Sequence, residues 1–329
     1  MNTLHVDIGL ARYSDWAFTS AVVALVVALL LLAFELAYAG GRRADHRAQV
    51  LAGSVAVDSI APGIVEEVPQ RPFDERVGRA GLAVLYLGIG LLLACIVLRG
   101  LATLRVPWGN MYEFINLTCF CGLVAGALVL RRGQYRPLWV FLLLPVLILL
   151  TISGRWLYAN AAPVMPALQS YWLPIHVSVV SLGSGVFLVA GIASILFLLR
   201  TSRLGDPDAD QRARGALERI VQRFPDAQTL DRIAYRTTIF AFPVFGFGVI
   251  FGAIWAEQAW GRYWGWDPKE TVSFVAWVVY AAYLHARSTA GWRDRKAAWI
   301  NVVGFVAMVF NLFFVNLVTV GLHSYAGVG

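Results

Sequence analysis

The stretch Trp260-Gly261-Arg262-Tyr263-Trp264-Gly265-Trp266-Asp267-Pro268-Lys269-Glu270-Thr271 decides how the rest of this chain is interpreted. It places three Trp and one Tyr within seven residues and then changes to charged residues. Asp267 is a helix-capping residue type, Pro268 fits the first helical position, and Glu270 stands where a capping box has its acid. The stretch therefore predicts an aromatic surface directly before a helix that Asp267 caps.

Two interpretations of this aromatic surface remain open from the residues alone. Trp and Tyr collect at membrane–water interfaces, so the stretch could belong to an aromatic belt. A flat aromatic surface beside a helix start also suits a flat, apolar, partly anionic ligand such as a porphyrin. Indole faces could cover the plate, and Arg262 and Lys269 could meet its carboxylates.

The composition is that of a membrane protein. The chain has 329 residues, of which 59% are hydrophobic and 14% are charged, whereas about a quarter of a soluble protein is charged. The net charge of +7 does not indicate a nucleic-acid partner, because an excess of Arg marks the cytoplasmic loops of membrane proteins. The composition predicts an all-α, polytopic protein in a lipid bilayer.

Eight segments approach the length of about 20 apolar residues that a bilayer span needs. We divide the chain into an N-terminal two-span region with a cytoplasmic loop, residues 1–100, and a membrane core, residues 101–329, whose Trp-rich external loop covers residues 256–270. The predicted spans begin and end near Trp16–Ala39, Ala80–Leu98, Tyr112–Leu130, Pro137–Ile152, Leu173–Leu199, Tyr235–Trp255, Pro268–Ala286 and Ala298–Leu322.

The basic residues predict the orientation of these spans. Of the 27 Lys and Arg, 21 follow spans one, three, five and seven, and six lie on the opposite side. Cytoplasmic loops carry the excess of Lys and Arg, so both termini and the Trp-rich loop are predicted to lie outside. On the inner side, residues 210–224 predict an amphipathic helix on the leaflet or, alternatively, a cytoplasmic docking face.

The five histidines fall into different groups once the spans are assigned. His5 and His46 lie in polar flanks. His176 and His323 lie at the outer ends of spans five and eight, on the same membrane face as the Trp-rich loop. Two neutral imidazoles can ligate haem iron from its two sides, although a histidine at a membrane interface can also serve as a hydrogen-bonding group.

His285 lies deeper, roughly 25 Å from Pro268 at the rise of an α-helix. An ionisable group within a span is a functional hypothesis by default. Its place beside Arg287 in a basic loop also fits a histidine at the inner surface whose hydrogen-bonding groups are satisfied and which binds no ligand.

Residues 260–271, with Trp277, Tyr280, Tyr283 and the following Leu284-His285-Ala286-Arg287, resemble the tryptophan-rich (WWD) signature of the proteins that handle haem in cytochrome c maturation. The Asp-Pro-Lys-Glu-Thr continuation is similar to the CcsA/ResC branch of system II, which some bacteria name CcsB. Trp108-Gly109-Asn110-Met111-Tyr112-Glu113 also resembles a family element.

The resemblance implies that the chain is the haem-handling subunit of a system II cytochrome c synthase in a bacterial plasma membrane. Such a subunit moves haem b to the outer face and presents it to apocytochrome c for thioether attachment. Whether this chain by itself is an enzyme stays open, since the family works with a ResB-like partner and no catalytic residue is visible here.

The resemblance also implies a set of site residues. His176 and His323 match the axial ligands of the outer haem, and His285 matches a ligand of an inner haem site whose opposite ligand comes from the partner. The remaining expected cofactor-binding residues are Trp260, Arg262, Tyr263, Trp264, Trp266, Asp267 and Lys269.

Two other functions remain as alternatives. Broken helices at mid-bilayer would favour a haem transporter or exporter without a synthase role, and no paired Gly/Pro interruption is evident in the sequence. A membrane b-type cytochrome would need two histidines at each of two levels, whereas only three suitably placed histidines occur.

Overall fold

The computed structural model describes residues 6–53, 72–164, 168–205, 215–317 and 322, with only the backbone described for residues 39–53. All regular secondary structure in these ranges is helical, as the composition predicts. Two short 3-10 helices, η1 (Gly133–Tyr135) and η3 (Arg203–Gly205), accompany the α-helices. The α-helices are α1 (Ile8–Gly53), α2 (Phe73–Thr103), α3 (Met111–Val129), α4 (Arg136–Trp156), α5 (Trp172–Arg200), α6 (Ala216–Val221), α7 (Ala227–Trp260), α8 (Pro268–Ser288) and α9 (Arg295–Leu317).

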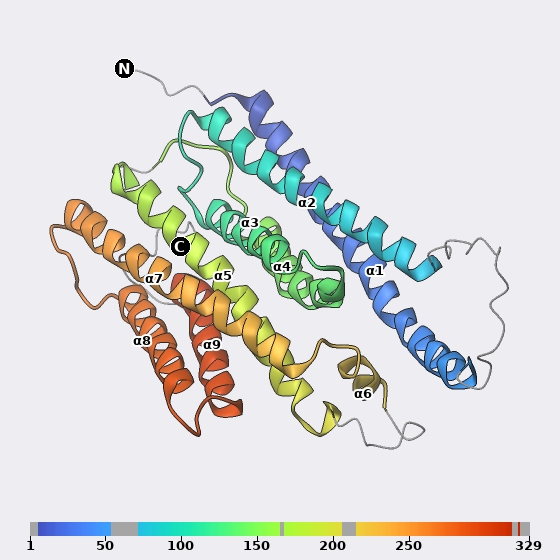
Figure 1. The fold of residues 1–329 in the computed structure, drawn as a ribbon. Helices are drawn as coiled ribbons and strands as arrows, with labels where there is room; N and C mark the ends of the chain where they lie inside the picture. Colours follow the sequence, from blue (N-terminus) through green and yellow to red (C-terminus); the bar gives the residue numbers. More distant parts are fainter. Residues whose placement is uncertain (1–5, 54–71, 165–167, 206–214, 318–321, 323–329) are drawn as a thin grey trace, which may run out of the picture.

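The long helices pack as neighbouring pairs (Figure 1). α1 packs along α2, α5 along α7, and α8 along α9, while α3 packs against both α4 and α5. α1 also packs on α4, so the first two helices lie against the remainder of the bundle. The division into residues 1–100 and 101–329 stays a prediction.

Seven of the helices in the described part are long and apolar enough to cross a membrane. The predicted span Pro268–Ala286 corresponds to α8 (Pro268–Ser288), which is not among these seven helices. Its first turn carries Lys269 and Glu270 and its last turn His285 and Arg287, and these charged and polar ends lower its hydropathy. The prediction of an all-α protein with about eight spans is thus confirmed in its fold class, with seven helices of the described part having the length and hydropathy of a span.

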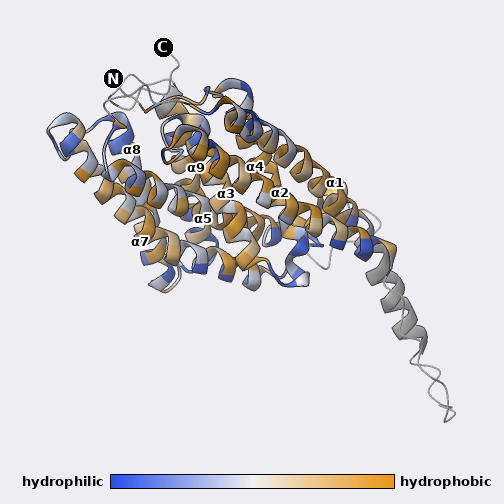
Figure 2. Ribbon diagram, turned by 90° about the horizontal axis from the view of Figure 1, so that it is seen from above, coloured by the Kyte–Doolittle hydropathy of each residue, from blue (hydrophilic) through white to orange (hydrophobic). Residues whose placement is uncertain are grey.

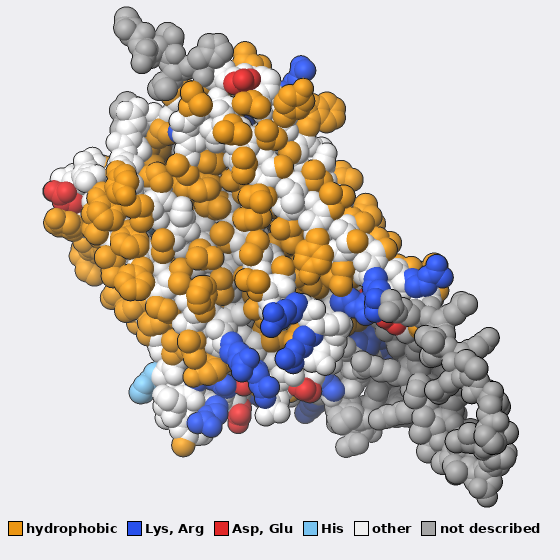
Figure 3. All heavy atoms as spheres, turned by 45° about the horizontal axis from the view of Figure 1, so that its top comes forward, with side chains coloured by type: hydrophobic (Ala, Val, Ile, Leu, Met, Phe, Trp, Pro, Cys, Tyr) orange, Lys and Arg blue, Asp and Glu red, His pale blue; other side chains and the backbone are white. Residues whose placement is uncertain are grey.

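The surface has the pattern of a multi-pass membrane protein. Hydrophobic side chains cover the middle of the face in Figure 3, and Lys and Arg side chains gather toward its lower end. Figure 2 likewise shows hydrophobic residues along the helices and hydrophilic residues concentrated near helix ends and loops. The exposed apolar side chains, such as Leu30, Ile148 and Phe247, therefore lie on the surface that contacts lipid in a membrane.

The amphipathic helix predicted on the inner side is shorter than expected. Of residues 210–224, the first five lie outside the described ranges, and α6 covers only Ala216–Val221. Val221 and Phe224 are buried in the core, where the Phe224 ring lies 4.9 Å from the Phe141 ring of α4. Val221 and Phe224 of the predicted face pack on the protein, whereas Leu217 is 54% exposed, so the leaflet and docking interpretations both stay predictions.

A buried hydrogen bond joins α7 to α9. The Asn301 side-chain amide donates to the Thr238 hydroxyl at 2.8 Å, and both residues are fully buried. The neighbouring Thr237 hydroxyl donates instead to Ile233 and Ala234 carbonyl oxygens of its own helix. Bonds between membrane helices contribute about 0.6 kcal/mol on average, with a maximum near 1.7.

We expect Thr238→Val to lower the stability of the purified protein by about 1 kcal/mol, because it removes the acceptor of a buried amide. Thr237→Val is the matched control and should change stability less, since no interhelical bond is lost. Thermal unfolding in detergent measures both, and equal effects of the two substitutions would contradict the assignment.

Candidate ligand-binding cavity

A cavity lies among α3, α5, α7, α8 and α9, beside the loop that carries the Trp-rich stretch. The cavity has a volume of about 160 Å³, counted as the space open to the centres of water molecules. This is room for on the order of ten waters. Four of the predicted site residues line it: His176, Tyr263, Trp264 and Lys269. The structure therefore brings together one histidine, two aromatic rings and one cation.

His176 lies in a slot between α5 and α7. Its Nδ1 is 2.7 Å from the Gly248 carbonyl oxygen, and its ring is nearly parallel to Trp255, with centroids 6.1 Å apart. A carbonyl oxygen can only accept, so Nδ1 carries the proton and Nε2 has the lone pair of the neutral imidazole. A hydrogen bond from the other ring nitrogen orients a metal-ligating histidine in the same way.

Gly252 makes room for this imidazole. A Cβ at position 252 would lie 2.6 Å from His176 Cε1, which is closer than non-bonded carbon atoms approach each other in proteins. One turn earlier, a Cβ at Gly248 would lie 2.6 Å from a Val180 methyl group of α5. The two glycines let α7 approach α5 closely, and one of them supplies the carbonyl that orients His176.

The aromatic stretch does not form one continuous platform. Trp260, at the end of α7, packs edge-on against Trp255 with centroids 4.8 Å apart. Trp264 lines the cavity and meets Trp266 edge-on at 5.7 Å, while Trp266 is 67% exposed with a positive φ of 57°. Of the four predicted aromatic residues, Tyr263 and Trp264 line the cavity; Trp260 and Trp266 lie outside its lining.

The predicted cap of α8 is confirmed. Asp267 accepts from the Lys269 amide at 3.3 Å, and Glu270 accepts from the Asp267 amide at 3.1 Å and the Gly265 amide at 2.8 Å. Asp267 also accepts from the Leu322 amide at 2.8 Å. Its carboxylate therefore joins the Trp-rich loop to the chain segment directly before His323.

The two predicted cations differ in position. Lys269 lines the cavity, and its Nζ lies 5.6 Å from the centre of the Phe114 ring. Arg262 folds back over its own loop, where its guanidinium occupies the space that a side chain at Gly265 would need. Of the two cations predicted to meet the carboxylates of a ligand, Lys269 lines the cavity.

Of the other predicted iron ligands, His285 does not line the cavity. His285 is exposed in the last turn of α8, where its carbonyl accepts from the Ser288 and Thr289 hydroxyls. His323 lies outside the described residues, as does His5, and His46 has only its backbone described.

Residues 108–323 match the family described as Cytochrome C assembly protein. The cytochrome c biogenesis protein CcsA of Gloeobacter violaceus is 34% identical over 299 residues, covering 77% of this chain and 87% of the relative. The CcsA protein of Thermosynechococcus vestitus is 35% identical over 288 residues, covering 78% of this chain and 89% of the relative. The chain belongs to the cytochrome c assembly family.

A solved structure shares the fold. The cytochrome c heme lyase CcmF superposes with a TM-score of 0.59 at 16% identity, covering 92% of this chain and 46% of the other. This chain thus spans about half the length of that lyase. Membership of the cytochrome c assembly family gives this multi-pass membrane protein a role in cytochrome c biogenesis.

The family match starts at Trp108, and every helix that lines the cavity lies within it. Trp255 and Phe114 also line the cavity, although no sequence pattern identified them as site residues. Each lies within an apolar run, where one more aromatic residue gives no signal. The spacing of Gly248 and Gly252 could have indicated a close helix contact near Trp255, because small residues one turn apart mark such contacts in membranes.

We expect Asp267→Ala to loosen the junction between the loop and residue 322. The substitution removes the acceptor for the Lys269 and Leu322 amides, and loss of a helix cap costs about 1 kcal/mol. Hydrogen–deuterium exchange at both amides should become faster. Asp226→Ala, which removes the cap of α7 at Thr229, is the control and should leave Leu322 unchanged; slow exchange at Leu322 in Asp267→Ala would contradict the contact.

Proposed function

We propose that this protein holds haem b in the cavity, on the outer side of the bacterial plasma membrane, and presents it to apocytochrome c. The observation that carries the proposal is His176, whose Nδ1 is committed to the Gly248 carbonyl in an indole-walled cavity. Nε2 is then the nitrogen with the ligand lone pair, and a bonded second nitrogen fixes the ring orientation that an axial ligand needs.

The chemistry of the walls supports a porphyrin. Trp108, Trp255 and Trp264 line the cavity with large apolar faces, which suit a planar macrocycle. Lys269 adds a cation that can meet a propionate, since charge-assisted bonds to carboxylates are strong. When bound, the haem supplies vinyl groups for thioether formation, while the chain binds and orients it.

The contact between Asp267 and Leu322 supports His323 as the second axial ligand. Leu322 is adjacent in sequence to His323, and its amide is held by the carboxylate that caps α8. Leu322 is thereby joined to the start of α8, the helix whose first turn contributes Lys269 to the cavity.

An inner site is proposed at the other end of α8. His285 is exposed there, and Val278, about two turns earlier, is exposed as well. A helix face that ends in an exposed imidazole is accessible to a membrane partner, and a ResB-like subunit would supply the opposite ligand. Haem would enter at this level and pass to the outer cavity.

The proposed orientation can be tested with cysteine labelling. In a variant whose three native cysteines are replaced, Tyr263→Cys should react with a membrane-impermeant maleimide from outside intact cells. Trp292→Cys, in the α8–α9 loop, should react only after permeabilisation. Both side chains are exposed, at 62% and 46%. The reverse labelling pattern would contradict the orientation.

We expect His176→Gly to remove the low-spin haem spectrum of the purified protein, and added imidazole to restore it, because imidazole can occupy the space of the lost side chain. His323→Gly should behave in the same way. His46→Gly is the control and should keep the spectrum. An unchanged spectrum in His176→Gly would end the assignment of the cavity as the haem site.

Covalent attachment separates the synthase role from haem export. The protein, co-expressed with a ResB-like partner and a reporter apocytochrome c, should yield covalent haem on the reporter. Its loss in His176→Gly, with rescue by imidazole, supports presentation of haem at the cavity. Haem bound normally without any attachment would favour an exporter.

A further inference from the structure

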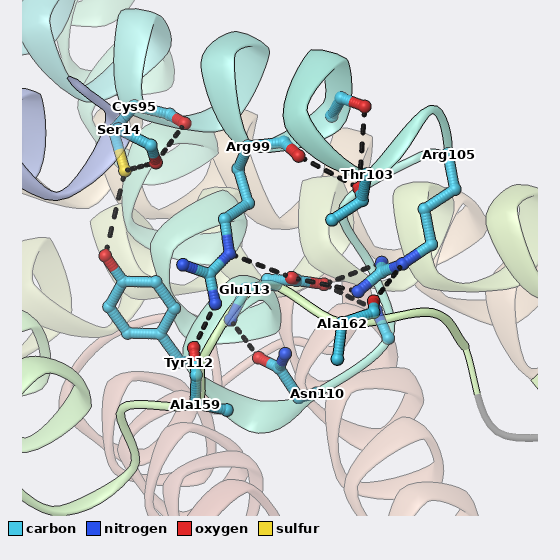
Figure 4. Close-up of polar contacts among 12 residues, drawn as sticks. Ser14, Cys95, Arg99, Thr103, Arg105, Asn110, Tyr112, Glu113, Ala159 and Ala162 are labelled. Atoms are coloured by element: carbon cyan, nitrogen blue, oxygen red, sulfur yellow. Dashed lines mark hydrogen bonds and ion pairs between the residues drawn. The ribbon is translucent and has the colours of Figure 1, made fainter. Parts of the chain in front are cut away.

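Glu113, in the first turn of α3, is the centre of a buried ionic network at the edge of the cavity (Figure 4). Its side chain is 1% exposed and contacts two guanidinium groups. Arg105 donates to both carboxylate oxygens, at 3.0 and 3.2 Å, and Arg99 donates to one of them at 3.2 Å. The Gly109 amide donates to the same carboxylate at 2.8 Å.

The network fixes two loops against the helices. Arg105 donates to the Ala162 carbonyl at 3.1 Å, and Arg99 donates to the Ala159 carbonyl, so the segment that follows α4 is bound as well. The Asn110 side chain accepts from the Glu113 amide at 2.9 Å. A buried ion pair is stable only when its remaining hydrogen-bonding capacity is satisfied, and these backbone partners provide much of that.

Trp108 lies within the segment that Glu113 holds. It lines the cavity one residue before Gly109, whose amide is bonded to the carboxylate. Its indole Nε1 is buried and has no acceptor among the described residues. A buried N–H without an acceptor is unfavourable, so an acceptor brought by the ligand would satisfy it.

We propose that the Trp108 indole N–H donates to a carboxylate of the ligand in the cavity, and that Glu113 is the positioning residue that holds Trp108 there. This inference rests on the proposed function and deepens it. Lys269 and Trp108 then offer an ammonium and an N–H to the anionic edge of one ligand.

The test of Trp108 compares two porphyrins. Haem and its dimethyl ester, which has no ionisable carboxylate, are titrated into purified haem-free protein and followed by absorbance. Trp108→Phe should weaken haem binding about tenfold, the size of one hydrogen bond to a charged group, and should weaken binding of the ester less, because the uncharged ester carbonyl accepts a weaker hydrogen bond. Trp139→Phe is the matched control, since its indole nitrogen is also buried with no acceptor in the described part of the chain but lies in the core.

Equal haem affinity of Trp108→Phe and wild type would overturn the proposal, and so would an equal loss for haem and ester. These outcomes differ from failure of the proposed function, in which the wild-type protein itself would bind no haem.

The test of Glu113 uses hydrogen–deuterium exchange in haem-free protein. Glu113→Gln should make exchange at Gly109 at least tenfold faster and weaken haem binding more than ester binding. Glu75→Gln, which removes an exposed pair with Arg79, is the control and should change neither. Unchanged exchange at Gly109 would overturn the positioning role. If Glu113→Gln does not fold, Arg105→Lys replaces it, because it removes the two-point contact and keeps the charge.

Discussion

The close contact between α5 and α7 is the constraint on which the cavity depends. Gly248 and Gly252 place no side chain of α7 between the two helices, so the Val180 and His176 side chains of α5 occupy that space. Apolar side chains gain little from leaving lipid for a helix interface, and membrane helices therefore associate through close packing of small residues. The same approach brings the Gly248 carbonyl within 2.7 Å of His176 and so sets the orientation of the imidazole.

The bilayer also explains where the polar residues lie. A polar group in a span is costly unless it is paired within the protein, and several buried polar groups of this bundle pair across helices. Asn311 donates to Ser273 at 2.7 Å beside the cavity, and Asn301 donates to Thr238 deeper in the bundle. Ser273 of α8 and Asn301 and Asn311 of α9 therefore have hydrogen-bond partners on neighbouring helices.

Local signals predicted the features that depend on nearby residues. The cap formed by Asp267 and Glu270 follows from residues three apart, and the helix bounds follow from runs of apolar residues. The cavity depends on distant contacts: Trp255 meets His176, which lies 79 positions earlier in the chain. The sequence predicted that Tyr263 and Trp264 belong to a site, but it could not distinguish them from Trp260 and Trp266. That difference comes from the packing of Trp260 on Trp255 and from the positive φ of Trp266.

The most direct test of the central claim is a cryo-electron microscopy map of the purified protein with haem bound. We expect the map to show the porphyrin against Trp264 and Trp255, its iron bonded to His176 Nε2, and the Nδ1 contact to the Gly248 carbonyl retained. Haem density outside this cavity, or a His176 ring turned away from the iron, would contradict the central claim.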